Sequence, residues 1–250
     1  ISTRAAVRFG TRGFGVDLDD NLVGMALAGA REQGVQDKVT FEARNIFDTD
    51  ISRATVVTAY LLNSVNMRLR PELFVQLKPG TRIVTHDFSF GNWAPDRRLT
   101  IDVPDKPYGP PRSDIMLWIV PADFAGVWYW TSPAVTGLTR YVLRFDQKFQ
   151  VLNGTTFVDG RRLRMIEGLV NGHELNFTLA VEGGSAPAMV RFSGRLSGDS
   201  ITGQAVVEGG TGAQPWQAKR IQPGKMDISG MDISGDAALR VANGRFTREQ

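Results

Sequence analysis

A histidine and an aspartate at the end of a predicted strand are the residues best suited to acid–base chemistry. His86 ends the apolar run Arg82–His86, and Asp87 follows it directly. Side chains of these types can exchange a proton with a substrate or hold it in place. A histidine at the start of a loop can equally bond to the backbone, and both interpretations stay open on the residues alone.

Asp17 is the candidate for binding a nucleotide. It ends the short apolar run Gly13–Asp17, and a carboxylate in that place can accept hydrogen bonds from both hydroxyls of a ribose. It can equally cap the helix that follows, as we expect Asp19 and Asp20 to do. The chain has two histidines and no cysteine, so we predict no metal site, no disulfide and no thiolate nucleophile.

The elements that position these residues alternate between strand and helix over residues 1–125. Strand-like runs separated by helices indicate a parallel sheet covered by helices, which binds ligands at the carboxyl ends of its strands. We expect a helix over 2–9. The predicted strands are 13–17, 38–42, 54–61 and 82–86, and the other predicted helices are 21–34 and 71–77.

Residues 126–222 have a different texture, because they alternate apolar and polar residues between tight turns. Residues 126–250 hold 18 of the 27 glycines, and turns are predicted at Asn153-Gly154, Asp159-Gly160 and Asn171-Gly172. Such hairpins close into an antiparallel barrel or a sandwich. The fold class is therefore α/β plus all-β, with domains at 1–125 and 126–222. Trp118, Trp128, Tyr129 and Trp130 are predicted to pack in an interdomain core, with a carbohydrate platform as the alternative.

Residues 223–250 form the third predicted segment, a flexible tail. It contains the pentad MDISG at 226–230 and again at 231–235. Two copies are too few for a solenoid, so slippage or a linker explains them.

Charge excludes some partners. The 250 residues carry 29 basic and 26 acidic side chains, and the 15 of each sign in residues 1–125 cancel. A nucleic-acid partner is therefore not expected, since it requires a basic stripe. There is no run of about 18 apolar residues that could cross a membrane. We favour the cytoplasm, but the chain begins at Ile1 without a methionine, so export stays open.

Residues 1–125 resemble a class I S-adenosylmethionine (SAM)-dependent methyltransferase. The stretches that carry the resemblance are RFGTRGFGVDLDDNLVGMALAGAREQGVQDKVTFEARNIFDTDI and ATVVTAYLLNSVNMRLRPELFVQLKPGTRIVTHDFSFGNWAPD. The ordered set of elements, rather than one motif, makes the resemblance specific. It implies a Rossmann-like methyltransferase sheet and SAM as cofactor.

The resemblance also assigns roles to residues. Asp17 would hold the SAM ribose and Leu18 would pack on the adenine. Asn45 and Ile46 would lie at the adenine edge, with Asn45 where the family commonly has aspartate. The methionine end would be lined by Ala59, Tyr60 and Leu61, and the substrate mouth by His86 and Asp87.

One family feature is missing, namely the Gly-rich first motif that should precede the helix over 2–9. The sheet is therefore incomplete, and we expect the natural protein to carry further N-terminal sequence. The leading interpretation is a methyltransferase whose acceptor is a protein lysine or a small molecule. The runner-up is a non-catalytic scaffold with a degenerate methyltransferase core and a binding β domain. A NAD-dependent Rossmann enzyme ranks third, because it also places an acid at Asp17.

Overall fold

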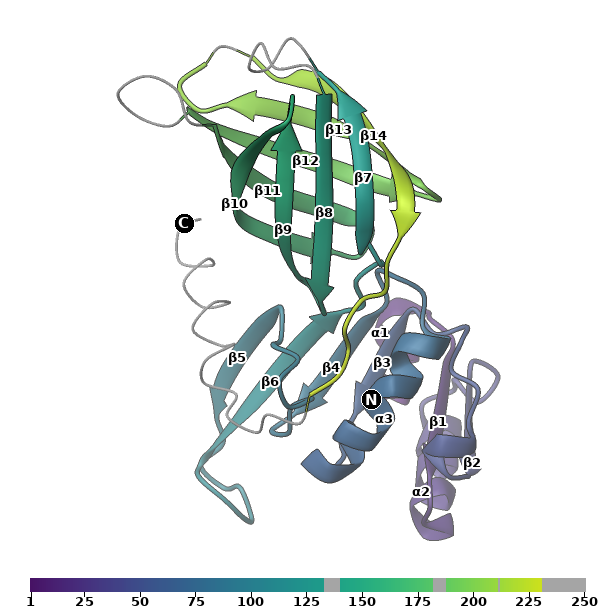
Figure 1. Ribbon diagram of the computed structural model, residues 1–250. Coiled ribbons are helices and arrows are strands. Elements are labelled where there is room, and N and C mark those ends of the chain that lie inside the picture. Colours follow the sequence, from purple (N-terminus) through teal and green to yellow (C-terminus); the bar gives the residue numbers. More distant parts are fainter. Residues whose placement is uncertain (133–139, 182–187, 211, 231–250) are drawn as a thin grey trace. The chain divides into compact units, whose positions relative to one another are not determined.

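The computed structural model describes residues 1–132, 140–181, 188–210 and 212–230 (Figure 1). The second copy of the pentad and the rest of the predicted tail, 231–250, lie outside them. The chain divides into two compact units, Ile1–Arg53 and Ala54–Gln250. Among the described residues, no helix is long and apolar enough to cross a membrane.

The first unit is a two-stranded parallel sheet with helices. It contains α1 (Ser2–Phe9), β1 (Gly13–Asp17), α2 (Asp20–Glu32), β2 (Val39–Ala43) and the 3₁₀ helix η1 (Ile46–Asp48). β1 pairs with β2 in parallel, and Ala6, Ala30, Val35 and Val39 form a small buried core. Asp19 caps α2 as predicted, because its side chain accepts a hydrogen bond from the Asn21 N–H at 2.8 Å.

The second unit begins with a four-stranded mixed sheet. It contains β3 (Val56–Ala59), α3 (Asn63–Gln76), β4 (Arg82–His86), β5 (Arg97–Asp102) and β6 (Arg112–Ile119), in the order β3-β4-β6-β5. β3 and β4 are parallel, whereas β6 runs antiparallel to both β4 and β5. The parallel pair and its helix confirm the α/β part of the predicted fold.

Helix α3 corrects the prediction of a short helix over 71–77. It begins at Asn63 and contains Pro71 in its interior. Proline lacks the N–H of one helical hydrogen bond, which is why it suggests a helix start in a sequence. Here the buried side chains of Asn66, Leu69 and Leu73 lie on both sides of Pro71 along the helix, so packing holds the two halves together.

The remaining strands form a closed antiparallel barrel, which confirms the all-β part of the prediction (Figure 1). Each strand pairs with the next along the chain, and the last closes on the first. The strands are β7 (Gly126–Thr131), β8 (Arg140–Lys148), β9 (Val151–Val158), β10 (Arg161–Asn171), β11 (Glu174–Val181), β12 (Ala188–Ser197), β13 (Ser200–Val207) and β14 (Gln214–Pro223).

One predicted turn of the barrel is wrong. Asn153-Gly154 lies inside β9, and the chain reverses instead at Phe149, which adopts a positive φ of 50°. Gly154 is needed for close packing rather than for a turn. A Cβ at this position would approach the Arg144 carbonyl oxygen to 2.7 Å and the Met165 sulfur to 2.9 Å.

The tryptophans do not gather in one interdomain cluster, so that part of the prediction is wrong. Trp128 and Trp130 belong to the barrel interior, where Trp130 stacks on Tyr141 at 4.8 Å. Trp118 packs instead on Phe90 and Trp93 beside the sheet. All three tryptophans are fully or almost fully buried, so none forms an exposed platform for a sugar.

The barrel is attached to the end of the sheet where β4 begins. The Gly80 N–H donates to the Val120 carbonyl at 2.8 Å, and the Ala122 N–H donates to the Gly172 carbonyl at 2.8 Å. Trp93 stacks on Phe149 of the barrel, with ring centroids 5.9 Å apart. The carboxyl ends of β3 and β4 therefore lie at the opposite end of the sheet from the barrel.

Candidate functional site

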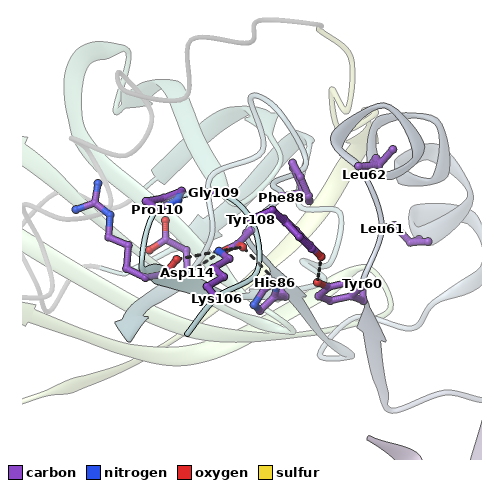
Figure 2. Close-up of a pocket in the computed structure, with 12 residues that line it drawn as sticks. Tyr60, Leu61, Leu62, His86, Phe88, Lys106, Tyr108, Gly109, Pro110 and Asp114 are labelled. Carbon is purple, nitrogen blue, oxygen red and sulfur yellow. Dashed lines mark hydrogen bonds and ion pairs between the residues drawn. The ribbon is translucent and has the colours of Figure 1, made fainter. Parts of the chain in front are cut away.

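A pocket of about 680 Å³ lies at the carboxyl ends of β3 and β4 (Figure 2). In an open sheet with parallel strands, this is the edge where ligands bind. The loop 103–111 between β5 and β6 forms the opposite wall. The lining residues are Tyr60, Leu61, Leu62, His86, Asp87, Phe88, Lys106, Tyr108, Gly109, Pro110, Arg112 and Asp114.

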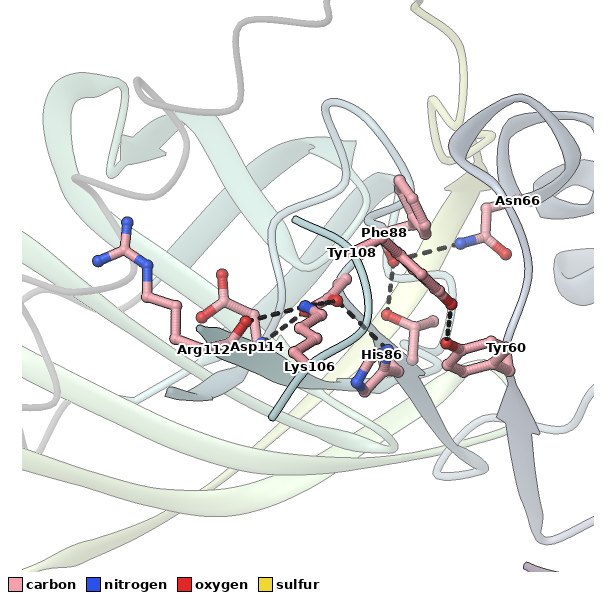
Figure 3. A network of polar contacts seen from close by, with 10 residues as sticks. Tyr60, Asn66, His86, Phe88, Lys106, Tyr108, Arg112 and Asp114 are labelled. Atoms are coloured by element: carbon pink, nitrogen blue, oxygen red, sulfur yellow. Dashed lines mark hydrogen bonds and ion pairs between the residues drawn. The ribbon is translucent and has the colours of Figure 1, made fainter. Parts of the chain in front are cut away.

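The polar network of this pocket, in which Figure 3 labels His86, Lys106 and Asp114, is centred on Asp87. One of its carboxylate oxygens bonds to the Lys106 ammonium, and the other accepts from the Asp114 N–H at 2.8 Å. His86 Nδ1 lies 3.5 Å from Asp87 Oδ2. Burial raises the pKa of Asp87, but these hydrogen bonds and the charges of His86 and Lys106 outweigh it and hold the pKa below its usual value.

The backbone at the end of β4 is shaped to present these side chains. Asp87 has a positive φ of 59°, which turns the chain sharply after the strand. The next carbonyl, that of Phe88, accepts hydrogen bonds from the Thr85 hydroxyl at 2.6 Å and from Asn66 Nδ2 at 3.2 Å. Because Asn66 and Thr85 are buried, this turn is held by groups that water does not reach.

Aromatic rings form much of the rest of the wall. The hydroxyls of Tyr60 and Tyr108 are 2.7 Å apart, and the Tyr60 ring lies 4.9 Å from the His86 ring. The hydrogen bond with Tyr108 is the main cause that raises the pKa of Tyr60. Tyr60 and Phe88 remain 64% and 40% exposed, so their faces are available to a ligand.

A second carboxylate, that of Asp114, lies on the strand next to Asp87. It accepts a hydrogen bond from the Thr100 hydroxyl at 2.6 Å and is 3.8 Å from Arg98 Nε. Asp87 and Asp114 are in turn linked through the Asp114 N–H. The pocket thus combines two carboxylates, each paired with a cation, with exposed aromatic faces. The aromatic faces suit a cationic or amine-bearing group.

In the first unit, the predicted nucleotide residues gather at the carboxyl ends of β1 and β2. Asp17 is exposed, and its Oδ1 accepts from the Asp19 N–H at 3.0 Å. Leu18 follows with a side chain that is 77% exposed. Asn45 Oδ1 accepts from the Phe47 N–H at 3.1 Å and so caps η1, in which Ile46 is the first residue.

Of the predicted site residues in the second unit, four line the pocket and one does not. Tyr60, Leu61, His86 and Asp87 line the pocket, whereas Ala59 lies just before it and is buried. The β5–β6 hairpin brings three further residues to the pocket that were not predicted from the sequence, namely Lys106, Tyr108 and Asp114. No group of three or more His, Cys, Asp or Glu side chains that could hold a metal occurs among the described residues.

Comparison with known proteins shows that residues 1–97 match the ANTKMT methyltransferase domain family. A protein-lysine N-methyltransferase of Saccharolobus islandicus (strain REY15A) is 41% identical over 88 residues, which are 35% of this chain and 55% of the relative. An RNA methyltransferase from Salinibacter ruber, solved in complex with S-adenosyl-L-homocysteine, is 47% identical with a TM-score of 0.44. That match covers 50% of this chain and 75% of the other. The chain thus spans about half the length of its curated relative.

Proposed function

We propose that the chain takes part in methyl transfer from SAM to the side-chain amine of a protein lysine, because residues 1–97 match the ANTKMT methyltransferase domain family and resemble a protein-lysine N-methyltransferase. The observation that carries this proposal is the pocket at the carboxyl ends of β3 and β4. It joins aromatic faces to the carboxylates of Asp87 and Asp114. A small-molecule amine would meet the same chemistry and is the other acceptor class.

The residues of the first unit fit the nucleoside part of SAM. Asp17 uses one oxygen within its own turn, and its other carboxylate oxygen is free to accept hydrogen bonds from ribose hydroxyls. Leu18 offers an exposed apolar side chain for the adenine ring. Asn45 keeps its amide N–H donors for the adenine edge, because only its carbonyl oxygen serves as a cap, and Ile46 lies beside it.

In the second unit, Ala59, Tyr60 and Leu61 line the methionine end in this proposal. When bound, SAM supplies an electrophilic methyl group on a sulfonium. His86 accepts the proton that the acceptor amine loses. Asp87 orients the His86 ring and, through Lys106, holds the 103–111 loop in place. The main contribution of the pocket is to align the amine and to exclude water.

A protein lysine is favoured over nucleic acid as acceptor by charge. Residues 1–125 carry equal numbers of acidic and basic side chains, and the pocket carboxylates Asp87 and Asp114 are paired with Lys106 and Arg98. These residues therefore offer no basic stripe to phosphates. The exposed rings of Tyr60 and Phe88 attract an ammonium group through cation–π contact.

Titration calorimetry with S-adenosylhomocysteine tests the cofactor part of the proposal. We expect micromolar binding to this chain and a loss of roughly 10- to 100-fold in Asp17→Ala, since hydrogen bonds to a charged group are each worth about 1.5–3 kcal/mol. Asp19→Ala is the matched control, because that neighbouring carboxylate caps α2, and it should bind normally. Equal affinities in both variants would refute the role of Asp17, and no binding to any of the three proteins would refute SAM as the cofactor of this chain.

The acceptor is tested by transfer of a labelled methyl group. A lysine-containing protein should be labelled in the presence of the chain, and the label should resist nuclease and be lost when the lysines are acetylated. Label in an RNA acceptor, with none in protein or in small amines, would refute the lysine assignment.

A further inference from the structure

The first MDISG pentad, 226–230, lies against the junction of sheet and barrel. Two backbone hydrogen bonds join it to the turn between β8 and β9, because the Asp227 N–H donates to the Gln147 carbonyl at 2.8 Å and the Phe149 N–H donates to the Asp227 carbonyl at 3.1 Å. The pentad is therefore docked in the manner of a short added strand, with its side chains free to be recognised.

The methionine at the first position is contacted at both its backbone and its side chain. The Met226 N–H donates to Asp123 Oδ2 at 3.2 Å, and the Met226 sulfur lies 3.2 Å from Gln147 Nε2. Gln147 is itself held by the Ala122 and Phe149 carbonyls, at 2.9 and 2.8 Å. The side-chain amide of Gln147 is thus held in place by hydrogen bonds other than its contact with Met226.

Asp227 and Ser229 form a turn, after which the carbonyls of Ser229 and Gly230 accept hydrogen bonds from side chains. Asp227 Oδ1 accepts from the Ser229 N–H at 2.7 Å, which is the Asx-turn expected of an Asp-x-Ser sequence. The Ser229 carbonyl then accepts from Asn92 Nδ2 at 3.2 Å, and the Gly230 carbonyl accepts from Arg70 Nη2 at 2.7 Å.

The last position of the pentad requires glycine. Gly230 has a φ of 107°, a conformation that L side chains rarely adopt, and a Cβ on it would collide with the amide of Asn92. The contacts of Met226, Asp227 and Gly230 therefore depend on the type of residue at each position, whereas Ser229 is held through its backbone.

We propose that Arg70, Asn92, Asp123, Gln147 and Phe149 form a binding site for the peptide Met-Asp-Ile-Ser-Gly, which we call the pentad site. The second copy of this sequence, residues 231–235, is its alternative occupant. Since the two copies are identical, every contact made by 226–230 is chemically open to 231–235. Exchange would lengthen the connection from Pro223 by five residues, and such a change in loop length costs little free energy.

Occupancy of the pentad site affects the loop beside the pocket, because Arg70 contacts both the pentad and this loop. This buried guanidinium also donates to the Phe90 carbonyl at 2.9 Å and to Asn92 Oδ1 at 2.7 Å, and it lies over the Phe149 ring at 5.1 Å. The loop that it holds begins at Phe88, a residue of the pocket wall. A spare pentad would keep this loop supported when the first copy leaves the site.

Redundancy of the two copies can be measured with Gly→Ala substitutions in the full chain. Gly230→Ala and Gly235→Ala should each leave the melting temperature within about 1 °C of the wild type, because one intact pentad remains. The double variant should melt roughly 3 °C lower or more, since the contacts of both copies are then strained. Gly198→Ala is the matched control. That glycine also has a positive φ, at 57°, but has no duplicate, so its loss should lower the melting temperature by itself.

Hydrogen exchange shows whether a pentad occupies the pentad site. The Phe149 amide, which donates to the docked pentad, should stay protected in both single variants and exchange rapidly in the double variant. The proposal is overturned if Gly230→Ala alone deprotects this amide as fully as the double variant does. It is also overturned if the double variant keeps full protection.

Discussion

Asp96 carries a charge that the fold accommodates poorly, so its removal should stabilise the protein. The residue lies directly before β5, where its Oδ2 accepts a hydrogen bond from the Ile119 N–H at 2.6 Å. Burial is the dominant influence and raises the pKa of Asp96 to about 6, although the hydrogen bond from Ile119 opposes it. We predict that Asp96→Asn is more stable than the wild type at neutral and alkaline pH.

The direction in which stability changes with pH follows from proton binding by Asp96. Between pH 3.8 and about 6 the folded protein keeps a proton on Asp96 that the unfolded chain has lost. Stability therefore falls as the pH rises through this window, and the full cost is reached above pH 6. The pKa difference of about 2 units corresponds to roughly 3 kcal/mol. Asparagine keeps a carbonyl oxygen for the Ile119 N–H but adds an N–H donor without an assigned acceptor, so we expect a net gain of about 2 kcal/mol.

Thermal unfolding of the wild type and of Asp96→Asn at pH 4 to 8 measures this effect. At pH 8 the variant should melt about 4–8 °C higher, and the difference should shrink towards zero near pH 4. Asp102→Asn removes an exposed carboxylate at the far end of β5 and should change the melting temperature by less than about 1 °C. A gain for Asp96→Asn that is the same at pH 4 and pH 8, or a loss at pH 8, would refute burial of the charge as the cause.

Two further substitutions test the pocket and the barrel. Lys106→Gln removes the cation that bonds to Asp87, so an NMR titration should show the pKa of Asp87 rising towards its usual value. Lys106→Arg is the control and should keep the pKa low. An unchanged pKa of Asp87 in Lys106→Gln would contradict the network. Trp130→Ala removes a ring from the barrel interior and should lower the free energy of unfolding by about 3–5 kcal/mol in denaturant titration. Tyr129→Ala, on the outer face of the same strand, should cost about 1 kcal/mol or less, and equal losses would contradict the inward orientation of Trp130.

Two strands that end in candidate site residues could be predicted from the sequence with their bounds. Gly13–Asp17 and Arg82–His86 are strands β1 and β4 over the predicted residues. Both are short apolar runs that follow turn residues, so local composition is enough to define them. Because ligands bind where such strands end, this also led to Asp17, His86 and Asp87 as site candidates.

Local signals failed where tertiary packing overrides them. Pro71 suggests a helix start and Asn153-Gly154 suggests a turn, yet the first lies inside α3 and the second inside β9. At Gly154 the deciding contacts come from the neighbouring strands, where a Cβ would meet Met165 and Arg144. A single sequence does not reveal those contacts.

The other half of the pocket could not be predicted for the same reason. Lys106 and Tyr108 belong to the connection between β5 and β6, which has no periodic pattern and contains several prolines and glycines. They reach Asp87 and Tyr60 only because β6 lies antiparallel beside β4. This part of the pocket wall is thus a consequence of strand order.

The position of the barrel restricts how it can influence the pocket. Every residue of the pocket wall lies between Tyr60 and Asp114, and the barrel is attached at the opposite end of the sheet, around Gly80 and Gly172. The barrel interior is filled by its own aromatic side chains. The segment from Phe88 to Trp93 connects the barrel and the pocket, because it has one end in the pocket wall and the other stacked on Phe149. Arg70 joins that segment to the pentad, so the pentad and the barrel act on the same loop.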